Sequence, residues 1–179
     1  MTRTDPASLS PTGPERRPGR PPVVLVVDDD DAVRRVLGIG LQHWGFDVRL
    51  SASGREAVEV YRSCGGYVDM VLLDVLMPDR DGVWTLSALR ALDARVQACF
   101  VTGDCGRYTE QDLLDLSVRA VFHKPVNLGA LADRLARMID RDRPEAGAAE
   151  VVTTTSRADG TAACPYAPVI SPWSSRRPR

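Results

Sequence analysis

Carboxylates follow two apolar runs of the chain, and such side chains can bind a cation or attack phosphorus. Val23–Val27 leads directly into Asp28 and three further aspartates, and Val71–Leu73 leads into Asp74. Short apolar runs rich in β-branched residues are typical of central strands in a parallel sheet. The carboxyl ends of such strands share one edge, where ligand sites gather. We therefore expect Asp28, Asp29 and Asp74 to lie together at that edge.

Carboxylates held close together repel one another, and a hard cation that prefers oxygen ligands relieves this repulsion. The alternative is that these aspartates only cap the helices that follow the strands, and Asp30 or Asp31 suits that role. Capping alone does not account for the whole set, because further residues of matching chemistry follow. Thr102 ends a later apolar run, and Lys124 follows another.

Lys124 is the only lysine of the chain, and the other 22 basic residues are arginine. An ammonium is a compact point charge that reaches a phosphoryl oxygen where the planar guanidinium fork does not fit. The Thr102 hydroxyl can donate a hydrogen bond to the same group, and Gly103 beside it leaves room there. The alternatives are a solvated lysine at a strand end and an ordinary β-branched strand residue.

Five strands alternate with five helices in the predicted arrangement. The strands are expected at Val23–Val27, Phe46–Leu50, Tyr67–Leu73, Val96–Val101 and Ala120–His123. The second helix is expected from Ser53 to the Gly65-Gly66 break, and the fourth is a short one near Thr109–Leu116. The other three are expected to turn apolar faces inward: Val33, Val36, Leu37, Leu41 and Trp44 in the first, Leu86, Leu89 and Leu92 in the third, and Leu128, Leu131, Leu135, Met138 and Ile139 in the fifth. This alternation predicts an α/β fold with a doubly wound parallel sheet. Analogy with flavodoxin-like three-layer sandwiches of this size gives the strand order 2-1-3-4-5.

Composition predicts one folded domain, residues 23–141, between two disordered segments, 1–22 and 142–179. The first segment is rich in Pro, Gly and Arg, and the second loses the apolar periodicity and is short for a second stable domain. The four cysteines have no CxxC spacing, so neither a disulfide framework nor a zinc site is expected. No apolar run suits a signal peptide or a membrane span, which predicts a cytoplasmic protein.

The combined motifs resemble the receiver domain of bacterial response regulators. They are Val-Val-Asp-Asp at 26–29, Leu-Leu-Asp-Val-Leu-Met-Pro-Asp-Arg-Asp-Gly at 72–82, Val-Thr-Gly at 101–103 and His-Lys-Pro at 123–125. The resemblance implies that Asp74 accepts a phosphoryl group from a sensor histidine kinase or phosphotransfer protein. It also implies that Mg²⁺ is held by Asp29 directly, by Asp28 largely through water, by Asp74, and by the main-chain carbonyl of Leu76.

The same resemblance assigns Thr102, Gly103 and Lys124 to the phosphoryl group, and makes the chain a signalling protein rather than an enzyme. Its partners would be a kinase and a downstream protein target, with no specific DNA and no membrane. One departure is Val121, because the family usually has an aromatic switch residue three positions before the lysine. Leu76 and Asp104 stand where the family tunes the lifetime of the aspartyl phosphate.

Two other functions remain open at this point. The first is a Mg²⁺-dependent phosphatase of the haloacid dehalogenase type, which also combines a strand-end Asp-x-Asp with a threonine and a lysine. The acidic pair that follows the lysine in those enzymes is missing here, and the loop after Asp74 has no counterpart in them. The second is a degenerate receiver that serves only as a scaffold. Turnover of small phosphate esters distinguishes the phosphatase from the others.

Overall fold

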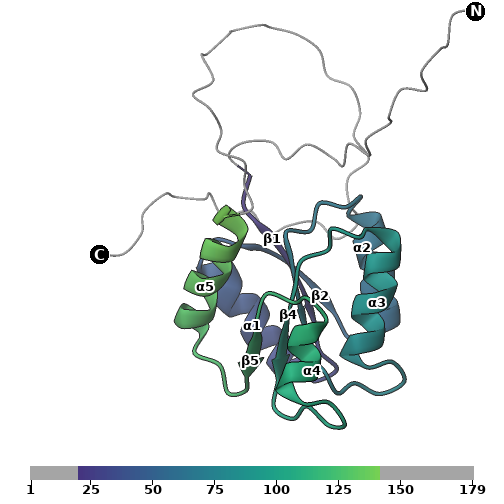
Figure 1. Cartoon of the computed structure of the whole chain (residues 1–179). Coiled ribbons are helices and arrows are strands. Elements are labelled where there is room, and N and C mark those ends of the chain that lie inside the picture. The colour runs from purple at the N-terminus through teal and green to yellow at the C-terminus, as the bar shows by residue number, and fades with distance from the viewer. Residues whose placement is uncertain (1–19, 142–179) are drawn as a thin grey trace, which may run out of the picture.

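The computed structural model describes residues 20–141 of the chain, as Figure 1 shows. In order, its elements are β1 (Val23–Val27), α1 (Asp31–His43), β2 (Asp47–Ser51), α2 (Gly54–Ser63), β3 (Met70–Leu73), α3 (Gly82–Leu92), β4 (Ala98–Thr102), α4 (Glu110–Asp115), β5 (Val121–His123) and α5 (Leu128–Arg141). All neighbouring strands are parallel, in the order β2-β1-β3-β4-β5. The predicted α/β class and strand order are both confirmed.

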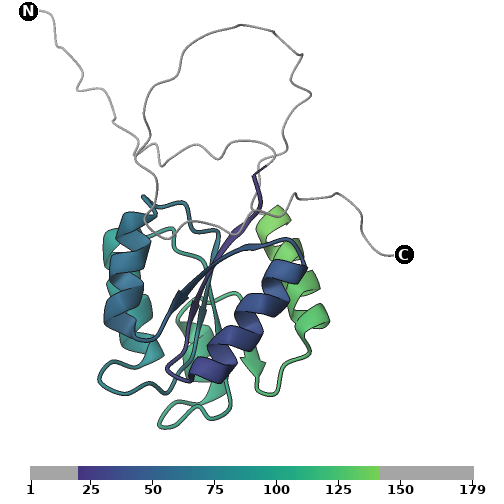
Figure 2. The same ribbon diagram turned by 180° about the vertical axis from the view of Figure 1, so that it is seen from behind.

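Helices cover both faces of the sheet, with α1 and α5 on one side and α2, α3 and α4 on the other (Figures 1 and 2). Successive side chains of a strand point to opposite faces. Val24 and Val26 therefore pack with α1 and α5, whereas Val23, Leu25 and Val27 pack with the opposite layer. Because β1 is buried on both faces, its apolar run is continuous rather than alternating.

Short polar side chains begin the helices that leave the site edge of the sheet. Asp30 caps α1 by accepting from the amides of Ala32 and Val33, and Ser53 caps α2. Asp81 accepts from the amide of Trp84 at the start of α3. These caps satisfy amide groups that have no partner inside the helix. Among the aspartates after β1, Asp30 therefore caps α1, whereas Asp28 and Asp29 do not and can bind other groups.

Two apolar residues predicted to face the core are exposed instead. Val36 is 56% exposed, and it lies about 100° around α1 from the fully buried Leu37. Leu92 is 42% exposed at the end of α3, where it borders an open hollow beside Tyr61. Strand β3 is also shorter than predicted, beginning at Met70, and Tyr67 before it is exposed.

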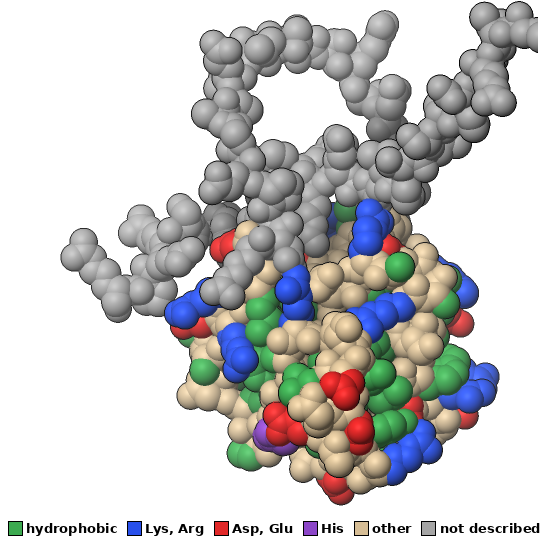
Figure 3. Space-filling view, viewed as in Figure 1, with side chains coloured by type: hydrophobic (Ala, Val, Ile, Leu, Met, Phe, Trp, Pro, Cys, Tyr) green, Lys and Arg blue, Asp and Glu red, His purple; other side chains and the backbone are tan. Residues whose placement is uncertain are grey.

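The predicted flanking segments are 1–22 and 142–179; residues 1–19 and 142–179 lie outside the described residues, so the boundaries of the folded domain stay a prediction. Within residues 20–141 no helix is long and apolar enough to cross a membrane. Acidic side chains gather over the region of α4 in Figure 3, and this helix carries Glu110, Asp112 and Asp115.

Candidate functional site

The carboxyl ends of four strands bring the predicted site residues to one edge of the sheet, at the bottom of Figure 1. Asp28 follows β1, Asp74 follows β3, Thr102 ends β4 and Lys124 follows β5. The parallel pairing of these strands places their ends side by side. Residues up to 96 positions apart in the chain therefore come into direct contact.

Lys124 joins the two buried carboxylates of this edge. Its Nζ donates to Asp28 Oδ2 and to Asp74 Oδ2, each at 2.7 Å. Burial lowers the pKa of Lys124, but the hydrogen bonds and charges of the two carboxylates outweigh burial and hold it above its usual range. The lysine therefore stays protonated, as a cation that an anionic group can approach.

Asp28 and Asp29 differ sharply although they are neighbours. Asp28 is 1% exposed, and its carboxylate also accepts from the amide of Asp30 at 3.0 Å. Burial raises the pKa of Asp28 above its usual range, against the opposing effect of Lys124. Asp29 is exposed, so its carboxylate is the more accessible of the two. That Asp29 is the direct metal ligand stays a prediction.

The pocket fits a divalent cation. One carboxylate oxygen each from Asp28, Asp29 and Asp74 lies within 4.8 Å of the others. The Asp74 oxygen that Lys124 does not contact, Oδ1, is buried and makes no hydrogen bond. A buried acceptor without a partner is costly, and an oxygen-binding cation such as Mg²⁺ or a covalent bond would satisfy it. Asp29 and Asp74 would hold the ion, with Asp28 behind them.

The Thr102 hydroxyl is hydrogen-bonded to the main chain of the loop after β4. The side chain is fully buried, and its Oγ1 donates to the main-chain oxygen of Asp104 at 2.6 Å. Gly103 next to it is exposed, and a Cβ there would lie 3.8 Å from the Cβ of Lys124, which is ordinary contact. Packing against protein atoms therefore does not require glycine at 103.

The loop after Asp74 needs glycine because the backbone approaches closely there. The positive φ of this loop belongs to Asp79, at 69°, and not to Gly82. A Cβ on Gly82 would lie 2.2 Å from the main-chain oxygen of Asp74. Gly82 thus allows the start of α3 to pack directly against the backbone of the aspartate.

Leu76 and Val121 are less buried than Asp28 and Asp74. The Leu76 side chain is 43% exposed and lies against Gly106 in the loop after β4. Val121 is half-buried and packs against the core layer on the α2, α3 and α4 side. The Lys124–Pro125 peptide bond is cis.

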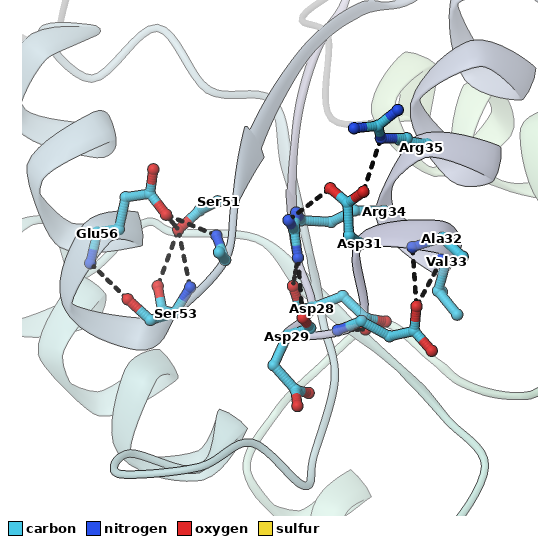
Figure 4. A network of polar contacts seen from close by, with 12 residues as sticks. Asp28, Asp29, Asp31, Ala32, Val33, Arg34, Arg35, Ser51, Ser53 and Glu56 are labelled. Carbon is cyan, nitrogen blue, oxygen red and sulfur yellow. Dashed lines mark hydrogen bonds and ion pairs between the residues drawn. The ribbon is translucent and has the colours of Figure 1, made fainter.

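Arg34 is the residue of this edge that the sequence did not reveal. Its guanidinium contacts the main chain of Asp28 and Asp29 and the carboxylate of Asp31, as Figure 4 shows. An arginine three residues after an aspartate suggests only an ordinary ion pair on a helix. The contacts with the two carbonyl groups depend on the turn between β1 and α1, which the sequence pattern does not specify.

A parallel five-stranded sheet with an acidic pocket and a half-buried lysine at its carboxyl edge defines a receiver-type α/β protein. The family model of the response regulator receiver domain matches residues 24–136. The chain belongs to the response regulator receiver family, whose members work in two-component signalling.

The chain is also similar in sequence to known two-component proteins. The chain is 33% identical over 132 residues to the response regulator MprA of Mycolicibacterium vanbaalenii, which covers 74% of this chain and 56% of that protein. It is 36% identical over 118 residues to the sensor kinase CckA of Brucella abortus, covering 66% of this chain and 12% of that protein. The match thus spans only part of the length of these relatives.

Solved structures of similar fold include receivers with a bound metal. The CheX–CheY–BeF₃–Mg²⁺ complex of Borrelia burgdorferi matches with a TM-score of 0.61 and 26% identity, over 66% of this chain and 89% of that one. TrrA of Thermotoga maritima with Mg²⁺ and BeF matches with a TM-score of 0.57 and 25% identity, over 65% and 98% of the two chains. The aspartate triad of this chain is typical of the Mg²⁺ site in receivers.

Proposed function

We propose that this chain is a single-domain response regulator that accepts a phosphoryl group on Asp74. The observation that carries the proposal is the state of that carboxylate: one oxygen is bound to Lys124, and the other is buried without a hydrogen bond. Phosphorylation of Asp74 would convert the unsatisfied carboxylate oxygen into part of an acyl phosphate. The donor would be a histidine kinase or a phosphotransfer protein.

The reaction is a transfer between two protein side chains. A carboxylate oxygen of Asp74 forms the new bond to phosphorus, and the bond from phosphorus to the donor histidine nitrogen breaks. Mg²⁺, when bound, neutralises charge on the transferring group. Asp29, Asp28 and the main-chain carbonyl of Leu76 would hold the ion, and Lys124 would contact a phosphoryl oxygen.

Thr102 would link the phosphoryl group to a change in shape. Its hydroxyl now donates to the carbonyl of Asp104, so a hydrogen bond to the phosphoryl group requires that contact to break. The loop after β4 would then change conformation with Gly103. Because Val121 is not aromatic, the aromatic swing of many receivers is not available at this position.

The output would pass through protein contacts on the face of α4, β5 and α5, in the cytoplasm. We expect no specific DNA binding, because residues 23–141 carry 18 acidic and 14 basic side chains. The acidic surface around α4 opposes an approach to nucleic acid from that side (Figure 3). The chain would not act as an enzyme on small substrates.

Incubation with acetyl phosphate and Mg²⁺, followed by intact mass spectrometry, tests the proposal. The wild-type chain should gain one phosphoryl group, and Asp74→Asn should gain none. Asp79→Asn is the matched control. It removes a carboxylate from the same loop, and the Asp79 side chain is 63% exposed. Equal labelling of Asp74→Asn and the wild type would contradict the assignment, and so would loss of labelling in the control alone.

A further inference from the structure

Arg34 makes three side-chain contacts with the turn between β1 and α1. Nη1 donates to the carbonyl oxygens of Asp28 at 2.7 Å and Asp29 at 3.0 Å, and Nη2 donates to Asp31 Oδ1 at 3.0 Å. Figure 4 shows the guanidinium folded back over the turn rather than extended into solvent. The side chain is only 13% exposed, unlike that of Arg35, which is 72% exposed.

Helix electrostatics do not explain the placement of this arginine. Arg34 lies in the first turn of α1, where the helix dipole is positive and disfavours a cation. Its burial also removes water from the guanidinium. The contacts with two carbonyls and one carboxylate must offset both costs, which indicates that the arginine is held there by the turn itself.

The two carbonyls that Arg34 binds fix the backbone on either side of one residue. The Asp28 carbonyl belongs to the peptide before Asp29, and the Asp29 carbonyl belongs to the peptide after it. Because peptide units are planar, holding both of them holds φ and ψ of Asp29. The direction of its Cα–Cβ bond is then set by the backbone, although Asp29 itself is exposed.

We propose that Arg34 is a positioning residue for the Mg²⁺ site, which acts by fixing the backbone of Asp29. The inference rests on the proposed function, since it concerns the ion that phosphorylation would require. Mg²⁺ demands nearly ideal octahedral geometry at short distances, whereas Ca²⁺ accepts irregular shells. Arg34 therefore favours Mg²⁺ over Ca²⁺ by keeping the aspartates in a defined arrangement.

Simple electrostatics predicts the opposite effect of removing this side chain. A cation beside the pocket repels a metal ion, so its loss alone would tighten Mg²⁺ binding. Positioning predicts that binding weakens, because partners of metal ligands typically contribute 10–100-fold in affinity. The sign of the change therefore separates the two effects.

The test is calorimetric titration of the full chain with Mg²⁺ and with Ca²⁺, using Arg34→Met, Arg34→Lys and Arg35→Met. Arg35→Met is the matched control, because it removes the same charge one residue away and also breaks an ion pair with Asp31. Arg34→Met should bind Mg²⁺ about 10-fold more weakly, with a smaller loss for Ca²⁺. Arg34→Lys should be weakened too, because one ammonium does not reproduce the planar fork. Arg35→Met should match the wild type.

Thermal unfolding shows whether each variant is folded. If Arg34→Met does not fold, the comparison is made with Arg34→Lys. Mg²⁺ affinity in the Arg34 variants equal to or tighter than wild type would overturn the inference. An equal loss of Mg²⁺ and Ca²⁺ would also overturn it, because it would indicate general loosening of the turn. Absence of Mg²⁺ binding by the wild type would instead overturn the proposed function together with this inference.

Discussion

Replacing Lys124 with methionine tests the charge arrangement of the site most sharply. The change keeps an unbranched side chain and removes the charge that Asp28 and Asp74 share. At 2.7 Å and an effective dielectric constant of about 20, each of the two contacts is worth about 6 kcal/mol before desolvation. Desolvation of the three groups offsets most of this, and breaking a buried ion pair typically costs about 3–5 kcal/mol.

We expect a loss of about 3 kcal/mol in the unfolding free energy, at the low end of that range because the Lys124 side chain is 21% exposed. For a domain of this size the melting temperature should fall by about 10 °C. The measurement is thermal unfolding by circular dichroism in the presence of a chelator. Arg55→Met is the control, since the Arg55–Asp79 ion pair is mostly exposed and contributes little.

Mg²⁺ should restore more stability to Lys124→Met than to the wild type, because the ion supplies positive charge to the same carboxylates. The variant should also bind Mg²⁺ more tightly, since no lysine competes for Asp28 and Asp74. A melting temperature of Lys124→Met equal to that of the wild type in chelator would refute the reasoning. An unchanged response to Mg²⁺ would refute the placement of the ion among these carboxylates.

Three further outcomes follow from the same geometry. Gly82→Ala should lose about 2–3 kcal/mol in urea unfolding, because its Cβ would collide with the main chain of Asp74, whereas Gly103→Ala should be nearly neutral. Asp29→Asn should weaken Mg²⁺ binding by at least about 10-fold in calorimetry while leaving the melting temperature in chelator unchanged or slightly higher. Burial beside a carboxylate raises the pKa of Tyr61 to about 12, so absorbance titration should show a step near that pH that Tyr61→Phe lacks. The stability that the protonated Tyr61 hydroxyl contributes is complete below about pH 10 and is lost as the pH rises through about 12.

The sequence was sufficient for the sheet and for the residues that gather at its edge. Four of the five strands end in or lead into a site residue, so their parallel arrangement brings Asp74 and Lys124 together. The carboxyl ends of the strands were predicted well because each apolar run stops where polar residues follow, whereas the start of β3 was placed too early.

Details that depend on side-chain direction were not available from the sequence. Val36 has a suitable apolar side chain for the core, but its place around α1 leaves it exposed. The need for glycine at 82 comes from the approach of a backbone eight residues earlier, not from a turn angle. Arg34 turns back toward the carbonyls before α1, and its residue type does not distinguish that from a solvated arginine.

The central claim is that Asp74, and no other carboxylate of the pocket, accepts the phosphoryl group. The most direct measurement is to phosphorylate the chain with acetyl phosphate and Mg²⁺, reduce the acyl phosphate with borohydride, and map the resulting homoserine by peptide mass spectrometry. Homoserine should occur at residue 74, and neither at 28 nor at 29. Homoserine at Asp28 or Asp29, or none in a folded chain that binds Mg²⁺, would contradict the proposed function.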